Sequence, residues 1–152
     1  MIKTILITTS MAALLLAATL STEKKVPAAT PAVATKTMKR AAIAALLKNM
    51  EYDNDRSLVR SRYYANLDEL AAAVKNEGFT ISLKGHADSV GRYKYNWMLS
   101  DKRALIVKNY LVRKGVKADK IVTTPYGSTV PVASNKTEEG RQRNRRVEIT
   151  VQ

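Results

Sequence analysis

The sequence contains no cysteine and only one histidine, His86, among its 152 residues. Without cysteine the chain forms no disulfide, has no thiolate nucleophile, cannot hold zinc through sulfur and cannot carry a lipid on an N-terminal cysteine. A single histidine provides neither a His-rich metal site nor a Ser-His relay, and the sequence has no glycine-rich phosphate loop. We therefore expect no enzymatic activity, no metal site and no cofactor.

Acidic residues and long apolar runs are also scarce. There are 13 Asp and Glu against 26 Lys and Arg, which gives a formal net charge of +13. No apolar run near 20 residues follows the N-terminal segment, which excludes a polytopic membrane protein. With 45% hydrophobic residues the chain is too apolar to be fully disordered. Its length fits one globular domain with an appendage, and its charge favours anionic partners.

The N-terminal segment, residues 1–21, differs in composition from the rest. Lys3 precedes a charge-free, largely apolar run over residues 4–20, which is the pattern of a secretory signal peptide. An uncleaved anchor is the alternative. Residues 22–37 are rich in Ala, Thr and Pro, so we predict a semi-extended linker there. The folded domain is then expected to span residues 38–152.

The periodicity of apolar residues predicts the elements of this domain. Spacings of three and four predict one helix that begins at a capping box of Asn66 and Glu69 and ends at Gly78. A second helix is expected over 93–114. Shorter helices are expected over 41–48 and 138–146, and alternation predicts strands near 50–53, 79–83, 121–123 and 147–151. The order of the main elements, β-α-β-α-β-β, predicts an α+β two-layer sandwich with two long helices on one mixed sheet of about four strands.

The second long helix carries an anomaly. At 100° per residue, Arg103 falls on the apolar face, between Leu99 and Val107. A buried guanidinium needs a partner, because an unpaired buried charge is too costly. Three solutions are open: the side chain reaches solvent at an edge, it pairs internally with a carboxylate such as Asp88, or it forms the floor of a pocket for an anionic ligand.

Several separated motifs agree, in order and spacing, with one known family. Together they cover about residues 46–152, and they resemble the OmpA-like peptidoglycan-binding domain (the OmpA/Pal/MotB family). The motifs are His86-Ala87-Asp88-Ser89-Val90-Gly91, Asn96-x-x-Leu99-Ser100-x-x-Arg103-Ala104 and Asn144-Arg145-Arg146-Val147-Glu148.

This resemblance implies a non-catalytic domain that binds the diaminopimelate residue of the cell-wall stem peptide. It implies that Asp88 and Arg103 hold the ammonium and carboxylate ends of that zwitterion, a pairing that charge-assisted hydrogen bonds favour. The further ligand-binding residues expected from it are Asn96, Asn144 and Arg145, with His86, Gly91 and Leu99 supporting the loop. One departure from the family pattern is Ala87, which stands where the family commonly has Thr and so removes a hydroxyl near the carboxylate.

The expected location is the periplasm or cell envelope, with peptidoglycan as partner and outer-membrane or other envelope proteins as further candidates. The missing cysteine argues against a lipid-anchored family member, so a small exported module is expected. The alternative function is a basic surface module that binds nucleic acid or anionic envelope polymers by charge, since four arginines lie within residues 141–146. The low aromatic content and the predicted export signal argue against nucleic acid.

Overall fold

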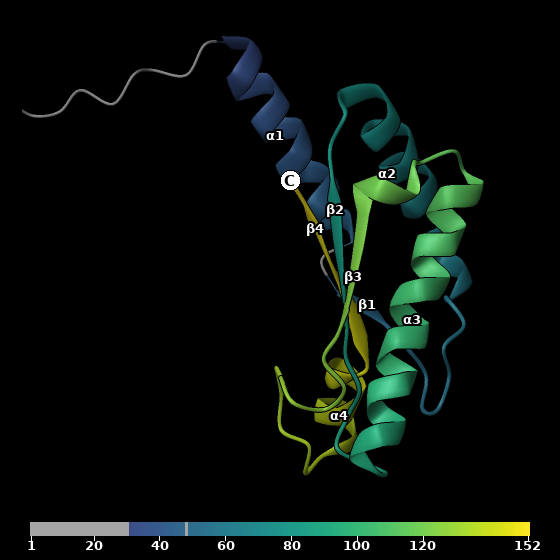
Figure 1. Ribbon diagram of the computed structural model, residues 1–152. Coiled ribbons are helices and arrows are strands. Elements are labelled where there is room, and N and C mark those ends of the chain that lie inside the picture. Colours follow the sequence, from purple (N-terminus) through teal and green to yellow (C-terminus); the bar gives the residue numbers. More distant parts are fainter. Residues whose placement is uncertain (1–30, 48) are drawn as a thin grey trace, which may run out of the picture.

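The computed structural model describes residues 31–47 and 49–152 of the chain (Figure 1). The predicted signal segment, residues 1–21, lies outside the described residues, and so do residues 22–30 of the predicted linker. The remainder folds into a four-stranded sheet with helices. The elements are α1 (Pro31–Leu46), β1 (Asn49–Glu51), α2 (Tyr64–Glu77), β2 (Ile81–Gly85), α3 (Tyr93–Arg113), β3 (Ile121–Pro125), α4 (Glu138–Asn144) and β4 (Arg146–Val151), with 3-10 turns at Ser61–Tyr63 and Ala118–Lys120.

The sheet is mixed and open, with the strand order β1-β4-β2-β3. Strands β2 and β3 are parallel, and β4 pairs antiparallel with both β1 and β2. Figure 1 shows α2 and α3 on the same side of this sheet. The predicted α+β class, with two long helices on one mixed sheet of four strands, is therefore confirmed.

The hydrophobic core lies between one face of the sheet and the helices. Ile81 and Leu83 of β2 face the core opposite Val151 and Ile149 of β4, and all four are buried. The intervening residues of β2 are only partly buried, so the alternation that predicted the strand has its expected physical cause. Helices α2 and α3 contribute Leu67, Leu70, Val74, Ala104, Val107 and Leu111 to the same cluster.

Helix α1 corrects the prediction for the linker. Residues 31–37 were expected to be semi-extended, but the helix begins at Pro31 and continues to Leu46. Alanine is the best helix former, and proline is tolerated in the first turn because its missing N–H would have no partner there. Ile43 is buried in the core, as is Leu47 directly after the helix. The segment is thus stabilised by packing at its C-terminal end.

The start of α2 also differs from the prediction. The proposed capping box of Asn66 and Glu69 is wrong, because the helix begins at Tyr64, continuing from the 3-10 turn. Tyr63 occupies the cap position in a helical conformation without a side-chain cap, and its hydroxyl accepts a hydrogen bond from the Glu51 amide at 3.0 Å. A tertiary contact with β1 therefore fixes this end. The predicted end at Gly78 is confirmed by its φ of 70°.

A close approach between β2 and α3 fixes how the helix packs on the sheet. A Cβ atom at Gly85 would collide with the backbone carbonyl of Ser100, so only glycine lets α3 pack this tightly on the end of β2. The consequence is that the first turns of α3 lie beside the segment that leaves β2. Among the described helices, none has the length and apolarity needed to cross a membrane.

Candidate functional site

A pocket of about 240 Å³ lies where the segment that follows β2 meets the first turns of α3. Two loops form it: the first loop, residues 52–60 between β1 and the 3-10 turn, and the second loop, residues 86–92 between β2 and α3. The first turns of α3 and Arg145, between α4 and β4, complete the wall. The sequence-predicted residues that line it are Asp88, Gly91, Asn96, Leu99, Arg103 and Arg145.

Asp88 and Arg145 form a buried ion pair at this pocket. Arg145 Nη1 donates to Asp88 Oδ2 at 2.8 Å, and each residue is only 4% exposed. The other carboxylate oxygen, Oδ1, accepts from the Val90 amide at 2.9 Å. Arg145 Nη2 also donates to Glu138 Oε1 at 2.7 Å and to Gln142 Oε1 at 2.6 Å. Side chains on three sides thus hold the guanidinium in one orientation.

Arg103 is fully buried, and it satisfies its charge in a way the sequence did not predict. Its Nε donates to the Arg56 carbonyl at 2.8 Å, Nη1 to the His86 carbonyl at 2.9 Å and Nη2 to the Asp53 carbonyl at 3.3 Å. It neither reaches solvent at an edge nor pairs with Asp88, whose partner is Arg145. Burial lowers the pKa of Arg103 to about 10, so it is still charged at neutral pH. Three carbonyls occupy three of its five N–H groups, which leaves donors for a ligand.

Asn96 and Gly91 shape the second loop. The Asn96 amide nitrogen donates to the carbonyls of Asp88 at 3.2 Å and Val90 at 3.0 Å, so both of its N–H groups point to the loop backbone. Gly91 has a φ of 94°, a left-handed conformation that favours glycine, and this turns the loop back to α3. Asn135 supports the loop from outside, since its Oδ1 accepts from the Ser89 amide at 3.2 Å.

Asn144 is buried, but it does not line the pocket. Its Oδ1 accepts from the amides of Val132 and Ala133, and its Nδ2 donates to the Ala133 carbonyl and to Asn135 Oδ1. These four contacts fix the loop between β3 and α4. Through Asn135 they also reach the second loop, so Asn144 is connected to the pocket through one intervening side chain.

His86 lies behind the pocket rather than in its wall. Its ring is 2% exposed and stacks on Tyr126, with centroids 5.2 Å apart, while its carbonyl accepts from Arg103. Both ring nitrogens are buried without a hydrogen bond. Burial, together with the nearby Arg146 guanidinium, lowers the pKa of His86 to about 4. The imidazole is therefore neutral at physiological pH and fills space beneath the loop.

Five residues that line the pocket were not predicted as site residues: Asn54, Asp55, Ala87, Val90 and Tyr95. The Tyr95 hydroxyl donates to Asp55 Oδ1, which joins α3 to the first loop across the pocket. Asp55 has a φ of 52°, so it occupies a left-handed turn position. The contact between Tyr95 and Asp55, 40 positions apart, has no local signature in the sequence.

The pocket thus presents fixed groups of both signs within a small volume. Arg103 and Arg145 supply guanidinium donors, while Asp88 and Asp55 supply carboxylate acceptors. Such a set recognises a small group that itself carries both charges, and the volume suits the end of a side chain rather than a whole drug-sized molecule. In the described part of the chain, His, Asp and Glu do not gather in groups of three or more that could hold a metal ion.

Comparison with known proteins gives three kinds of match. Residues 51–145 match the model of the OmpA family. Outer membrane protein A of Bordetella avium is 44% identical over 101 residues, which cover 66% of this chain and 52% of that protein. The peptidoglycan-binding protein ArfA of Mycobacterium tuberculosis is 49% identical over 71 residues, covering 47% of this chain and 22% of that protein. The crystal structure of the peptidoglycan-associated lipoprotein from Burkholderia pseudomallei has a TM-score of 0.66 and 28% identity, covering 72% of this chain and 93% of that one.

Proposed function

The chain belongs to the OmpA family, and from that premise we propose that it binds peptidoglycan without catalysis. The resemblance noted in the sequence is thus confirmed at the level of the family. The relatives include outer membrane proteins and a peptidoglycan-associated lipoprotein, which agrees with the predicted location in the periplasm and cell envelope. The chain spans about half or less of the length of its first curated relatives. The proposal therefore covers the binding of peptidoglycan and does not extend to the other activities or protein partners of those relatives.

The ligand group we propose is the zwitterionic end of diaminopimelate in the stem peptide. The observation that supports it is the juxtaposition of a fully buried, incompletely used guanidinium, Arg103, with the carboxylate of Asp88 in one small pocket. The ligand carboxylate would accept from the free Arg103 N–H groups. The ligand ammonium would donate to Asp88, which Arg145 holds in place. Each charge-assisted hydrogen bond contributes about 1.5–3 kcal/mol before the entropy cost of binding.

The other predicted site residues take supporting roles in this proposal. Asn96 positions the second loop, because its two amide donors are already used by the loop backbone. Gly91 and Leu99 contribute pocket wall. Asn144 and His86 do not contact the ligand in this proposal. Asn144 holds the loop after β3, and His86 packs beneath the second loop.

The charge-only alternative is weakened by the arginines at residues 141–146. Arg141 pairs with Glu138, Arg145 with Asp88 and Glu138, and Arg146 with Glu148 at 2.5 Å. Three of the four arginines that suggested a nucleic-acid surface are therefore neutralised within the domain. Phosphate backbones are bound by unpaired Lys and Arg that release counterions, and this cluster is not of that kind.

The test is co-sedimentation of the purified chain with insoluble sacculi at low salt and at about 0.5 M salt, where surface attraction is screened. Asp88→Asn and Arg103→Lys are compared with Asp101→Asn and Lys94→Gln, which change charge on α3 without touching the pocket. We expect the two pocket variants to lose salt-resistant pelleting and the two controls to retain it. Pelleting that disappears with salt in every variant would mean that charge alone causes the binding.

Sacculi of the lysine type test the ligand group itself. Lysine lacks the second carboxylate of diaminopimelate, so the contact with Arg103 cannot form. We expect retention on lysine-type sacculi to fall toward that of Arg103→Lys on diaminopimelate-type sacculi. Equal retention of the unaltered chain on both wall types would refute the zwitterion assignment while leaving peptidoglycan binding intact.

A further inference from the structure

A second pocket, of about 340 Å³, is lined by Val74, Lys75, Gly78, Gly115, Val116, Lys117 and Lys120. It lies where the C-terminal ends of α2 and α3 meet the 3-10 turn before β3. The two valines are buried and form an apolar floor. Both glycines adopt left-handed conformations that end their helices, and a Cβ at Gly78 would meet no atom within 4 Å. The space beside Gly78 is therefore open, because glycine has no side chain to fill it.

The charge lining this pocket is of one sign. Three lysines contribute to it, and no acidic residue is among the described residues that line it. Lys75 has a structural task, since its Nζ donates to the Lys114 carbonyl at 3.5 Å at the end of α3. For Lys117 and Lys120, by contrast, the described part of the chain offers no ion pair or side-chain hydrogen bond. Two ammonium groups are thus available at the rim.

The carbonyl ends of two helices would by themselves repel an anion. One carbonyl at each end is engaged, because the amide of Gly78 donates to the Val74 carbonyl and that of Val116 to the Leu111 carbonyl. Lys75 meets the last turn of α3 from the side, as described above. The three lysine ammonium groups that line the hollow offset the negative ends of the two helix dipoles.

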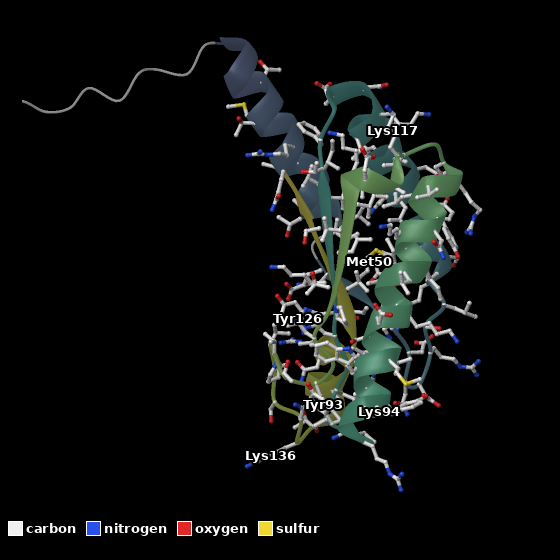
Figure 2. All side chains as sticks on the ribbon, in the orientation of Figure 1. Met50, Tyr93, Lys94, Lys117, Tyr126 and Lys136 are labelled. Carbon is white, nitrogen blue, oxygen red and sulfur yellow. The ribbon has the colours of Figure 1, made fainter. Side chains whose placement is uncertain are left out.

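The position of this pocket separates it from the candidate wall site. Figure 2 shows Lys117 at one end of the molecule and Tyr93, Lys94 and Lys136 at the other. The 21 residues of α3 connect the two ends, which corresponds to about 30 Å at 1.5 Å per residue. The N-terminal end of α1 lies toward the same end as Lys117 (Figure 1). The described part of the chain thus begins at the end of the molecule that carries the lysine pocket.

We propose that this lysine pocket binds a phosphate-bearing anion, with Lys117 and Lys120 as the ligating residues. Lysine ammonium groups bind phosphate as point charges, and the apolar floor accommodates the carbon skeleton that carries the phosphate. An anionic lipid headgroup and a free phosphate ester share this chemistry. The assignment is independent of the wall site and does not require peptidoglycan binding.

The experiment compares two double variants that remove the same charge from opposite ends. Lys117→Gln with Lys120→Gln empties the lysine pocket of its free cations. Lys94→Gln with Lys136→Gln is the matched control on exposed positions at the far end. Flotation of the full chain is measured with neutral phosphatidylcholine vesicles and with vesicles that also contain phosphatidylglycerol. The neutral vesicles give the baseline contributed by the apolar residues 4–20.

Phosphatidylglycerol is expected to raise vesicle binding about 25-fold less in the pocket variant than in the unaltered chain, because each lysine near an anionic surface contributes about fivefold. The salt is kept at about 0.1 M, where the Debye length is about 10 Å, so the control lysines, about 30 Å away along α3, are screened from the pocket end and the control is expected to retain that increment. In parallel, inorganic phosphate is titrated while the amide resonances of Gly78 and Gly115 are followed. Saturable shifts in the unaltered chain that vanish in the pocket variant would support the same pocket with a soluble ligand, whatever the vesicles show.

Two results would overturn the proposal. Equal losses in both double variants, with no saturable shift of the Gly78 and Gly115 resonances, would show that net charge alone attracts the protein to the vesicles. Absence of vesicle binding together with unshifted Gly78 and Gly115 resonances would show that the pocket takes no phosphate. Urea unfolding verifies that both variants fold, and retention on sacculi at 0.5 M salt is expected to be unchanged in each.

Discussion

Replacing Asp88 by Asn tests the buried ion pair most directly, because it removes charge while keeping the shape of the side chain. Both carboxylate oxygens accept hydrogen bonds, Oδ1 from the Val90 amide and Oδ2 from Arg145. An amide has one oxygen, so in either orientation one of these donors must face an NH₂ group. The variant therefore loses one of two good contacts and gains a donor–donor contact in a buried place.

The expected cost follows from which bond is lost. A hydrogen bond to a charged group contributes about 1.5–3 kcal/mol, and Arg145 keeps its contacts with Glu138 and Gln142. Because the guanidinium is not left without partners, we expect a loss of about 2–3 kcal/mol in the free energy of unfolding, below the cost of a fully orphaned buried charge.

Urea unfolding of the full chain, followed by circular dichroism, measures this loss as a lower midpoint at unchanged slope. Asp101→Asn, on the outer side of α3, is the control, and it is expected to lie within about 0.5 kcal/mol of the unaltered chain. A loss below about 0.5 kcal/mol for Asp88→Asn would refute the reasoning, because the pair with Arg145 would then contribute nothing measurable to the fold.

Three further predictions concern the same end of the molecule. Gly85→Ala forces a Cβ against the Ser100 backbone and should lower stability by about 1–3 kcal/mol, seen as a lower thermal midpoint; an unchanged midpoint would contradict the close approach. Arg103→Lys loses the planar guanidinium that reaches three carbonyls, so the free energy of unfolding measured in urea should fall by about 1–3 kcal/mol. An unchanged free energy of unfolding would mean that a lysine satisfies all three carbonyls. His86 has a pKa of about 4 in the folded chain and near 6.5 when unfolded, so the unfolded state binds the proton first and stability falls as pH drops from about 6.5 to 4. His86→Phe should flatten the urea midpoint across that range, and an unchanged slope would assign the pH dependence to other groups.

The sequence predicted the position of Arg103 better than its partners. Helical periodicity is enough to place residue 103 on the buried face of α3. Its acceptors are main-chain carbonyls of Asp53, Arg56 and His86, and every residue has such a carbonyl, so no side-chain pattern marks them. The sequence also did not predict that Asp88 pairs with Arg145 rather than with Arg103. Several arginines could pair with this carboxylate, and only the three-dimensional arrangement determines which one does.

The errors at the helix starts have related causes. An Ala- and Pro-rich segment is compatible with both a linker and the first turn of a helix, and packing of Ile43 and Leu47 favours the helix. At α2 a local capping signal was overruled by the contact between Tyr63 and β1. Asn144 illustrates the limit of resemblance, which indicates that a residue matters without saying whether it meets the ligand or holds a loop.

The three carbonyls held by Arg103 come from both loops, two from the first and one from the second. One side chain therefore staples the two walls of the pocket together before any ligand arrives. Little conformational freedom is left to lose on binding, so the entropy cost falls mainly on the ligand. A substitution in residues 53–56 can therefore weaken ligand binding without contacting the ligand, because it shifts the Arg103 guanidinium. At Arg103 itself, any change that alters ligand affinity also alters the stability of the fold.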